Sequence, residues 1–261
     1  MPITLERVRH ELRFRIATVV ASRRITPRMA RVTVTAADLA SFRSDAYDDH
    51  VKLFFAPPGE TLAVPERTPD GLVFPGGIRP VGRDYTPRAF DPSRAELTID
   101  FVLHGDGPAA TWGAAAAPGD TLGIGGPRAS FVPRGAADWY LLAGDETALP
   151  AIGRRLEELP LGARAIVALE VADTAERQVF SSAAALELHW AIRSAGDSLA
   201  DLVGRLVLPS GDGYAFVAGE AGASATLRAQ LVGPRGLPPA AVRTAGYWRR
   251  GEADYDDGHP H

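Results

Sequence analysis

The six residues from Arg83 to Arg88 carry an aromatic ring, a hydroxyl group and two guanidinium groups on one short segment. Tyr85 can stack on a flat heteroaromatic ring, Thr86 can hydrogen-bond a polar edge, and the arginines can pair with phosphate oxygens. These groups suit a flavin nucleotide, although a surface strand with solvated arginines would look the same. In one extended strand, Arg83 and Tyr85 would face away from Thr86 and Arg88. A flavin would then have to lie along the strand, or the strand would have to bend at Pro87.

A glycine-containing segment, 104–112, follows the predicted strand over 96–103 and leads into a short alanine-rich helix that ends before Pro118. Glycines let the backbone approach a ligand, and the first amides of a helix favour phosphate. The segment therefore predicts a pyrophosphate cradle, with a plain turn and cap as the alternative. His104 could contact the cofactor or serve as a structural hydrogen-bonding group.

A second candidate site follows the apolar strand predicted over 139–144. Parallel sheets bind ligands at the carboxyl ends of their strands, where the segment 143–150 lies. It lacks the GxGxxG spacing of one dinucleotide-binding subtype. Thr147 is predicted to cap the next helix.

Two further strand ends could complete this site. The segment from Glu170 to Asp173, which ends the strand over 165–171, carries acidic groups that could meet an adenosine ribose, whereas Arg177 could meet a 2′-phosphate. The choice between NADH and NADPH therefore stays open. The segment around Gly219 and Glu220 ends the strand over 213–220 and should lie near the nicotinamide.

The pattern of apolar residues differs between the two halves of the chain, and each pattern predicts the strands and helices that must position these groups. The first half predicts short antiparallel strands that form a small barrel, with a long irregular loop over 57–82. These strands cover 14–20, 30–35, 50–56, 84–88, 96–103 and 120–124. The second half predicts a parallel sheet with helices on both faces. Its strands cover 139–144, 165–171, 188–192 and 213–220, and its helices cover 148–159 and 223–232. We expect a β-barrel domain over 1–135 and an α/β domain over 136–261.

Composition excludes several classes of function. The 261 residues contain no cysteine, so disulfides, cysteine-ligated clusters and thiol catalysis are excluded. A net charge of −4 gives no reason to expect nucleic acid or an anionic membrane as partner. No apolar run could span a membrane, and the first residues do not resemble a secretory signal. The six histidines are scattered, so no resident metal is expected. We expect a monomer in the cytoplasm.

An ordered set of motifs resembles a known family. These motifs are Arg83-x-Tyr85-Thr86-x-Arg88, Asp100-Phe101-Val102-Leu103-His104-Gly105, Gly107-Pro108-Ala109, Gly125-Gly126-Pro127-Arg128, the run 143–150 and Gly246-Tyr247-Trp248-Arg249-x-Gly251. Over roughly 12–252 the chain resembles the siderophore-interacting proteins, flavin-dependent ferric-siderophore reductases of the ferredoxin-reductase superfamily. The resemblance implies an FAD-binding β-barrel followed by an NAD(P)H-binding α/β domain.

The resemblance also implies roles for individual residues. Tyr85 and Thr86 would be catalytic, stacking on the flavin and approaching its N5 edge. The FAD would be held by Arg83, Tyr85, Thr86, Arg88, Asp100, Val102, His104, Gly107, Pro108, Ala109 and Thr111. The dinucleotide would be held by Gly144, Asp145, Thr147, Ala148 and Glu220. The ferric siderophore, which is often anionic, would be held by Lys52, Arg128 and Arg249. Pro87 has no backbone N–H, so it cannot donate the hydrogen bond that a flavin contact to the backbone amide at this position would need.

The implied function is reduction of chelated Fe(III) by NAD(P)H through FAD, which releases the weaker-bound Fe(II). Resemblance to a superfamily does not fix the electron acceptor. A reductase of a quinone, free flavin or partner protein is therefore an alternative, as is a siderophore-binding protein without redox function.

Overall fold

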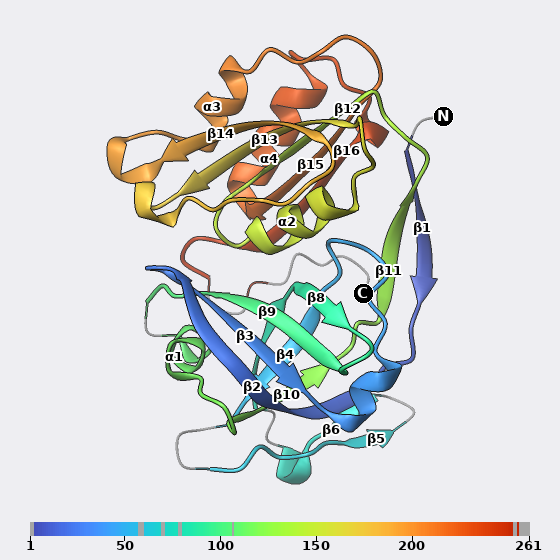
Figure 1. The fold of residues 1–261 in the computed structure, drawn as a ribbon, viewed down its shortest axis with the longest axis vertical. Coiled ribbons are helices and arrows are strands. Elements are labelled where there is room, and N and C mark those ends of the chain that lie inside the picture. Colours follow the sequence, from blue (N-terminus) through green and yellow to red (C-terminus); the bar gives the residue numbers. More distant parts are fainter. Residues whose placement is uncertain are drawn as a thin grey trace. The chain divides into compact units, whose positions relative to one another are not determined.

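The computed structural model describes residues 3–56, 60–68, 71–77, 80–105, 107–252 and 255. The chain forms two compact units (Figure 1). One unit comprises Arg7–Phe131, and the other comprises Met1–Glu6 together with Val132–His261. The chain passes from one unit to the other twice, once within β1 (Thr4–Arg9) and once within β11 (Ala129–Arg134). These two strands pair in a two-stranded sheet.

The first unit is built on a seven-stranded antiparallel sheet in the order β7-β4-β10-β2-β3-β9-β8. Alternating apolar residues direct one face of each strand inward, as in β2, where Ala17 and Val19 are buried and Thr18 between them is exposed. The strands are β2 (Phe14–Thr26), β3 (Met29–Thr35), β4 (Val51–Phe55), β7 (Val81–Tyr85), β8 (Pro87–Asp91), β9 (Glu96–Val102) and β10 (Thr121–Gly125). The helix α1 (Pro108–Ala115) and a 3₁₀ turn at Ala37–Ser41 complete the unit's core.

The predicted strand over 84–88 is wrong, because the chain breaks at Thr86 into two strands. Tyr85 in β7 pairs with Val51 at one edge of the sheet, and Pro87 in β8 pairs with Ile99 at the other edge. Two residues of extended chain span about 7 Å. The sheet must therefore curl until its edges almost meet, and it forms a half-barrel (Figure 1).

The predicted loop over 57–82 also needs correction. Its described part contains a short antiparallel hairpin of β5 (Glu66–Thr68) and β6 (Gly71–Val73), a 3₁₀ turn at Pro75–Gly77 and the start of β7. Residues 57–59, 69–70 and 78–79 lie outside the described residues. The hairpin was missed because its two strands have only three residues each and lie among the prolines and glycines of this segment.

The second unit contains a five-stranded parallel sheet in the order β14-β13-β12-β15-β16. Its strands are β12 (Trp139–Gly144), β13 (Arg164–Val171), β14 (Ala185–Ile192), β15 (Gly213–Glu220) and β16 (Val242–Trp248). Its helices are α2 (Leu149–Glu158), α3 (Leu199–Arg205) and α4 (Ala221–Val232). Four strands and two helices agree with the sequence prediction, while β16 and α3 were not predicted.

Strand order determines which face each helix covers. From β12 the chain proceeds to β13 in one direction, and later from β15 to β16 in the other. Because such crossovers are right-handed, α3 and α4 share one face and α2 covers the opposite face (Figure 1). Leu199 and Val203 of α3 accordingly pack in one cluster with Leu227 and Leu231 of α4. The strand order reverses between β12 and β15, which is where such sheets bind nucleotides.

Candidate functional site

The tyrosine of the 83–88 segment lies at the edge of the half-barrel. The Tyr85 ring centroid lies 4.6 Å from that of Phe101, with the rings tilted by 41°. Burial raises the pKa of the Tyr85 hydroxyl, so this group stays protonated. Thr86, at the junction between the two sheet edges, is buried. Because of the break at Thr86, the simple alternation expected for Arg83, Tyr85, Thr86 and Arg88 does not apply.

Asp100 organises the arginines beside this segment. Its buried carboxylate accepts from Arg31 Nε at 2.6 Å and Arg31 Nη2 at 2.7 Å, and Arg88 Nε lies 3.9 Å from its Oδ2. Asp100 thus binds Arg31 and lies near Arg88, and the direct contact to FAD that the resemblance implies for Asp100 stays a prediction. Arg31 was missed because its register opposite Asp100 is a property of the folded sheet.

In the described chain, no side chain caps the N-terminus of α1. Gly107 provides no side-chain cap, and Pro108 occupies the first turn. The first intrahelical bond runs from Thr111 N to Gly107 O at 2.9 Å, and the amides of Ala109 and Ala110 have no hydrogen-bond partner in the described chain. Helix N-termini of this kind bind phosphate. Val102 ends β9 just before this loop, and His104, Gly107 and Thr111 are exposed around it.

The predicted substrate-binding cations belong to both units. Lys52 Nζ lies 2.7 Å from Asp84 Oδ2, and both side chains are partly exposed. Lys52 pairs across the sheet with Gly125, three residues before the exposed Arg128. The half-barrel therefore brings Lys52 and Arg128 to the same end of its sheet.

Arg249 follows β16 in the other unit. Its Nη1 lies 3.2 Å from Glu252 Oε1, and its guanidinium carbon lies 4.6 Å from the centroid of the Tyr255 ring. These contacts raise the pKa of the Arg249 guanidinium, with the hydrogen bond to Glu252 as the main cause.

Asp145 lies at the switch point of the parallel sheet, the place between β12 and β15 where the strand order reverses. Its Oδ1 accepts from the amide and hydroxyl of Thr147 at 2.9 and 2.5 Å. Its Oδ2 accepts from Glu220 N and Trp248 Nε1, both at 2.8 Å. Burial raises the pKa of the Asp145 carboxyl, and these donors oppose the rise. The carboxylate thus joins the carboxyl ends of β12, β15 and β16.

Two glycines make room for this arrangement. Gly219 has a φ of +129°, and a Cβ there would lie 2.5 Å from the Asp145 carboxylate. A Cβ on Gly144 would lie 2.5 Å from the Ala148 Cβ and 2.6 Å from the Ala218 carbonyl oxygen. At both positions, only glycine lets the strand end approach its neighbour.

The helices after these strands differ from the prediction. Thr147 does not cap α2: the cap position is Ala148, which makes no side-chain cap bond, and the Thr147 hydroxyl donates to Asp145. Glu220 caps α4, since its Oε2 accepts from Ala223 N at 2.7 Å. Of these two helices, α2 therefore has an N-terminus without a side-chain cap, and this N-terminus lies beside Gly144.

Glu170 is fully engaged by its neighbours. Its Oε1 accepts from Arg193 Nε at 2.8 Å and its Oε2 from Leu199 N at 2.7 Å. Arg193 also makes a bidentate pair with Glu146 at 3.0 and 2.8 Å, which was not predicted. Arg177, in contrast, is exposed. The ribose contact expected for Glu170 would have to compete with these bonds.

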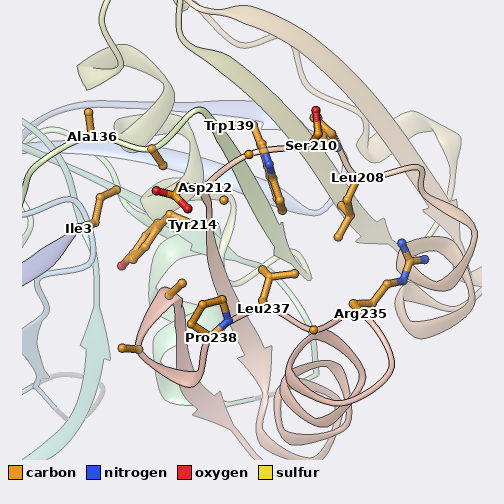
Figure 2. Close-up of a pocket in the computed structure, with 17 residues that line it drawn as sticks. Ile3, Ala136, Trp139, Leu208, Ser210, Asp212, Tyr214, Arg235, Leu237 and Pro238 are labelled. Atoms are coloured by element: carbon orange, nitrogen blue, oxygen red, sulfur yellow. The ribbon is translucent and has the colours of Figure 1, made fainter. Parts of the chain in front are cut away.

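A cavity of about 350 Å³ lies at the opposite, amino end of this sheet (Figure 2). It contains Trp139 and Tyr214, from the starts of β12 and β15, together with Leu237. The Trp139 Nε1 is buried and has no hydrogen-bond partner in the described chain. Dinucleotides bind at the carboxyl ends of parallel strands, so this cavity is separate from the Asp145 cluster.

The described residues fit two organic cofactors. Unpartnered amides at the α1 N-terminus and the arginines around Asp100 suit the phosphates of FAD. The uncapped α2 N-terminus at the switch point suits a dinucleotide. In this part of the chain, no three histidine, aspartate or glutamate side chains gather as metal ligands would. None of its helices is both long and apolar enough to cross a bilayer.

Comparison with known proteins gives the same division of the chain. Residues 18–131 match the family model described as siderophore-interacting FAD-binding domain, and residues 137–251 match that of the siderophore-interacting protein. An NADPH-dependent ferric-chelate reductase from Escherichia coli is 34% identical, covering 93% of this chain and 96% of its own. The ferric vibriobactin reductase ViuB from Vibrio cholerae is also 34% identical, covering 94% of both chains.

A solved structure agrees with the sequence comparisons. The crystal structure of a siderophore utilization protein from T. fusca superposes with a TM-score of 0.88 at 40% identity, covering 97% of this chain and 98% of that one. Similarity of sequence and fold over nearly the whole length shows that the chain belongs to the siderophore-interacting protein family.

Proposed function

We propose that this protein is an NADPH-dependent, FAD-containing reductase that reduces ferric iron held by a siderophore and so releases Fe(II). The observation that carries the proposal is its similarity, over more than nine-tenths of both chains, to a relative named as an NADPH-dependent ferric-chelate reductase. The half-barrel and the switch point each contain a helix N-terminus without a side-chain cap, and each of these would bind the phosphates of one nucleotide.

The half-barrel would hold FAD. The α1 amides and Arg83 would contact its phosphates, and Arg88 would do so while paired with Asp100. Tyr85 would offer its ring and Thr86 its hydroxyl to the isoalloxazine. Bound FAD supplies two-electron acceptance from a nicotinamide and one-electron donation to iron, which no side chain of this chain can provide.

The parallel sheet would hold NADPH. Asp145 fixes three strand ends through its own hydrogen bonds, so we assign it a positioning role instead of a direct ligand contact. Gly144, Thr147, Ala148 and Glu220 would border the dinucleotide. Arg177 is exposed and makes no ion pair in the described chain, which favours a donor with a 2′-phosphate.

Lys52, Arg128 and Arg249 would attract the ferric siderophore. Catecholate and hydroxamate complexes are bulky and often anionic, so exposed cations suit them better than a closed pocket. The iron arrives already chelated as substrate, and its reduction needs no general acid or base. We further propose that the protein acts as a monomer in the cytoplasm.

The test is anaerobic mixing of the flavin-loaded protein with NADPH or NADH, then with a ferric siderophore and a ferrous chromophoric trap. We expect NADPH to bleach the flavin absorbance, and the ferric complex to restore it while Fe(II) appears. A flavin that bleaches but ignores ferric chelates would indicate another acceptor. A protein that binds ferric chelate without flavin would instead be a binding protein.

A further inference from the structure

The half-barrel unit contains a cavity of about 340 Å³ with an unusually basic lining. It lies where the start of β2 and the loop after β10 meet the residues that precede β2. Arg9, Arg13, Arg15 and Arg43 all line it. None of these four belongs to the groups predicted to hold flavin, dinucleotide or siderophore.

Arg15 is the most informative of the four because it is only 4% exposed. Its Nε donates to Asp38 O at 3.3 Å and its Nη1 to Gly126 O at 3.2 Å, and its guanidinium carbon lies 5.6 Å from the Phe42 ring centroid. In the described chain no carboxylate lies within ion-pair distance of it, and its Nη2 makes no hydrogen bond. Burial lowers the pKa of the Arg15 guanidinium. A buried cation without an ion pair is energetically unfavourable, and a bound anion would relieve this.

The neighbouring carboxylates act on Arg15 only at longer range: these are Asp38 and Glu11, and Glu11 also lines the cavity. Arg13 is neutralised by Glu11, at 3.0 and 2.7 Å, and also donates to Ser41 Oγ at 3.1 Å. Arg43 pairs with Asp45, outside the cavity lining, at 3.2 Å. Asp38 acts on the Arg15 guanidinium through its backbone carbonyl, while its exposed carboxylate attracts from a distance.

Arg9 is the second uncompensated charge. It is exposed at the end of β1 and makes no ion pair in the described chain. His10, also in the lining, uses Nε2 to contact Ser130 Oγ at 2.7 Å. The cavity therefore carries two arginines, one buried and one at its rim, with which no carboxylate of the described residues forms an ion pair.

We propose that this arginine cavity, formed around Arg15 and Arg9, binds a compact oxyanion of two or more charges, of the phosphate or polycarboxylate class. Guanidinium groups present paired N–H donors that match the oxygens of both classes, and the volume admits a small molecule. The site would balance the buried Arg15 charge. It concerns the half-barrel alone and does not depend on the proposed reductase activity.

The test is isothermal titration calorimetry on the full-length, FAD-loaded protein in Tris chloride at constant ionic strength. Inorganic phosphate and citrate are the two probes. We expect saturable binding of at least one probe, weakened about tenfold in Arg9→Gln, which corresponds to the loss of one charged contact of about 1.4 kcal/mol. Phosphate alone would assign the mineral anion, citrate alone would assign a carboxylate ligand, and binding of both would assign a general oxyanion site.

Arg24→Gln is the matched control, because Arg24 is an exposed arginine on β2 that does not line the cavity. It should leave the affinity unchanged. Arg15→Met should abolish binding and, if it folds, should raise the melting temperature by removing a buried charge. Absence of saturable binding to the wild-type protein would overturn the proposal. Equal weakening by Arg24→Gln and Arg9→Gln, or undiminished affinity in Arg9→Gln, would also overturn it.

Discussion

The indole Nε1 of Trp248 donates a hydrogen bond of 2.8 Å to the carboxylate of Asp145, a residue 103 positions earlier in the chain. This bond joins the last strand of the parallel sheet to its central strand at the carboxyl edge. Glu220 N donates to the same oxygen, so the strand between them is included. One buried carboxylate thereby sets the spacing of three strand ends at the proposed nucleotide site.

Trp248→Phe should destabilise the protein by about 1.5–3 kcal/mol, the usual contribution of a hydrogen bond to a charged group. Losing this donor raises the folded-state pKa of Asp145 further. A carboxyl group with a raised folded-state pKa loses stability as the pH rises above its unfolded value, which is near 3.8. The loss of unfolding free energy caused by Trp248→Phe should therefore be larger at pH 7 than at pH 4.

Urea unfolding followed by far-UV circular dichroism at both pH values measures this difference. Trp190→Phe is the control, because Trp190 stacks on Phe180 away from Asp145 and its effect should not change with pH. An equal deficit at pH 4 and pH 7 for Trp248→Phe would contradict an ionised Asp145.

Gly219→Ala should reduce stability and raise the KM for NADPH about tenfold or more. A φ of +129° costs a non-glycine residue about 1–3 kcal/mol, and here the Cβ would also displace the Asp145 carboxylate. Gly196→Ala has a positive φ of 85° but no atom within 4 Å of the added Cβ, so it isolates the backbone cost. Thermal unfolding and steady-state kinetics of both variants should show that only Gly219→Ala changes the KM. An unchanged KM in both would remove Asp145 from the nucleotide site.

Asp84→Asn and Lys52→Ala should change turnover of anionic ferric siderophores in opposite directions. Asp84 neutralises Lys52 at 2.7 Å, so its replacement frees a positive charge for substrate. Exposed ion pairs contribute at most about 1 kcal/mol, so we expect kcat/KM to change by up to about fivefold. A neutral ferric complex is the control substrate, and a similar change with it would argue against electrostatic capture.

Tyr85→Ala should weaken FAD binding by about tenfold through loss of ring stacking, while Tyr85→Phe should retain most of the affinity. Fluorescence titration of FAD into deflavinated protein gives both dissociation constants. Because Tyr85 also packs on Phe101, the melting temperature must be recorded for each variant. Unchanged FAD affinity in Tyr85→Ala would show that the ring does not contact the flavin.

Local patterns predicted most elements but not their pairing. The apolar runs of β12, β13 and β15 identify buried parallel strands, and β15 begins and ends where predicted. The strand β16 was missed because it lies at the sheet edge and mixes arginine, threonine and glycine with apolar residues. The helix α3 was missed because it has only seven residues.

The candidate site shows the same limit. The glycines and the small residues before α1 and α2 predict phosphate-binding turns from local sequence alone, because such turns depend on local backbone conformation. The partners of Asp145, Asp100 and Glu170 come from distant strands, and only the folded register brings them together. Residues predicted to contact a ligand can therefore act by holding other protein groups.

The break at Thr86 has a consequence for how this fold can vary. Loops elsewhere in the half-barrel can lengthen or shorten without changing which strands pair, but a single residue connects the two edges of the sheet. An insertion beside Thr86 would move Tyr85 and Arg88 apart and would open the sheet along its whole length. Among relatives that keep this fold, the distance in sequence between the tyrosine and the second arginine should therefore be invariant, even where neighbouring segments differ in length.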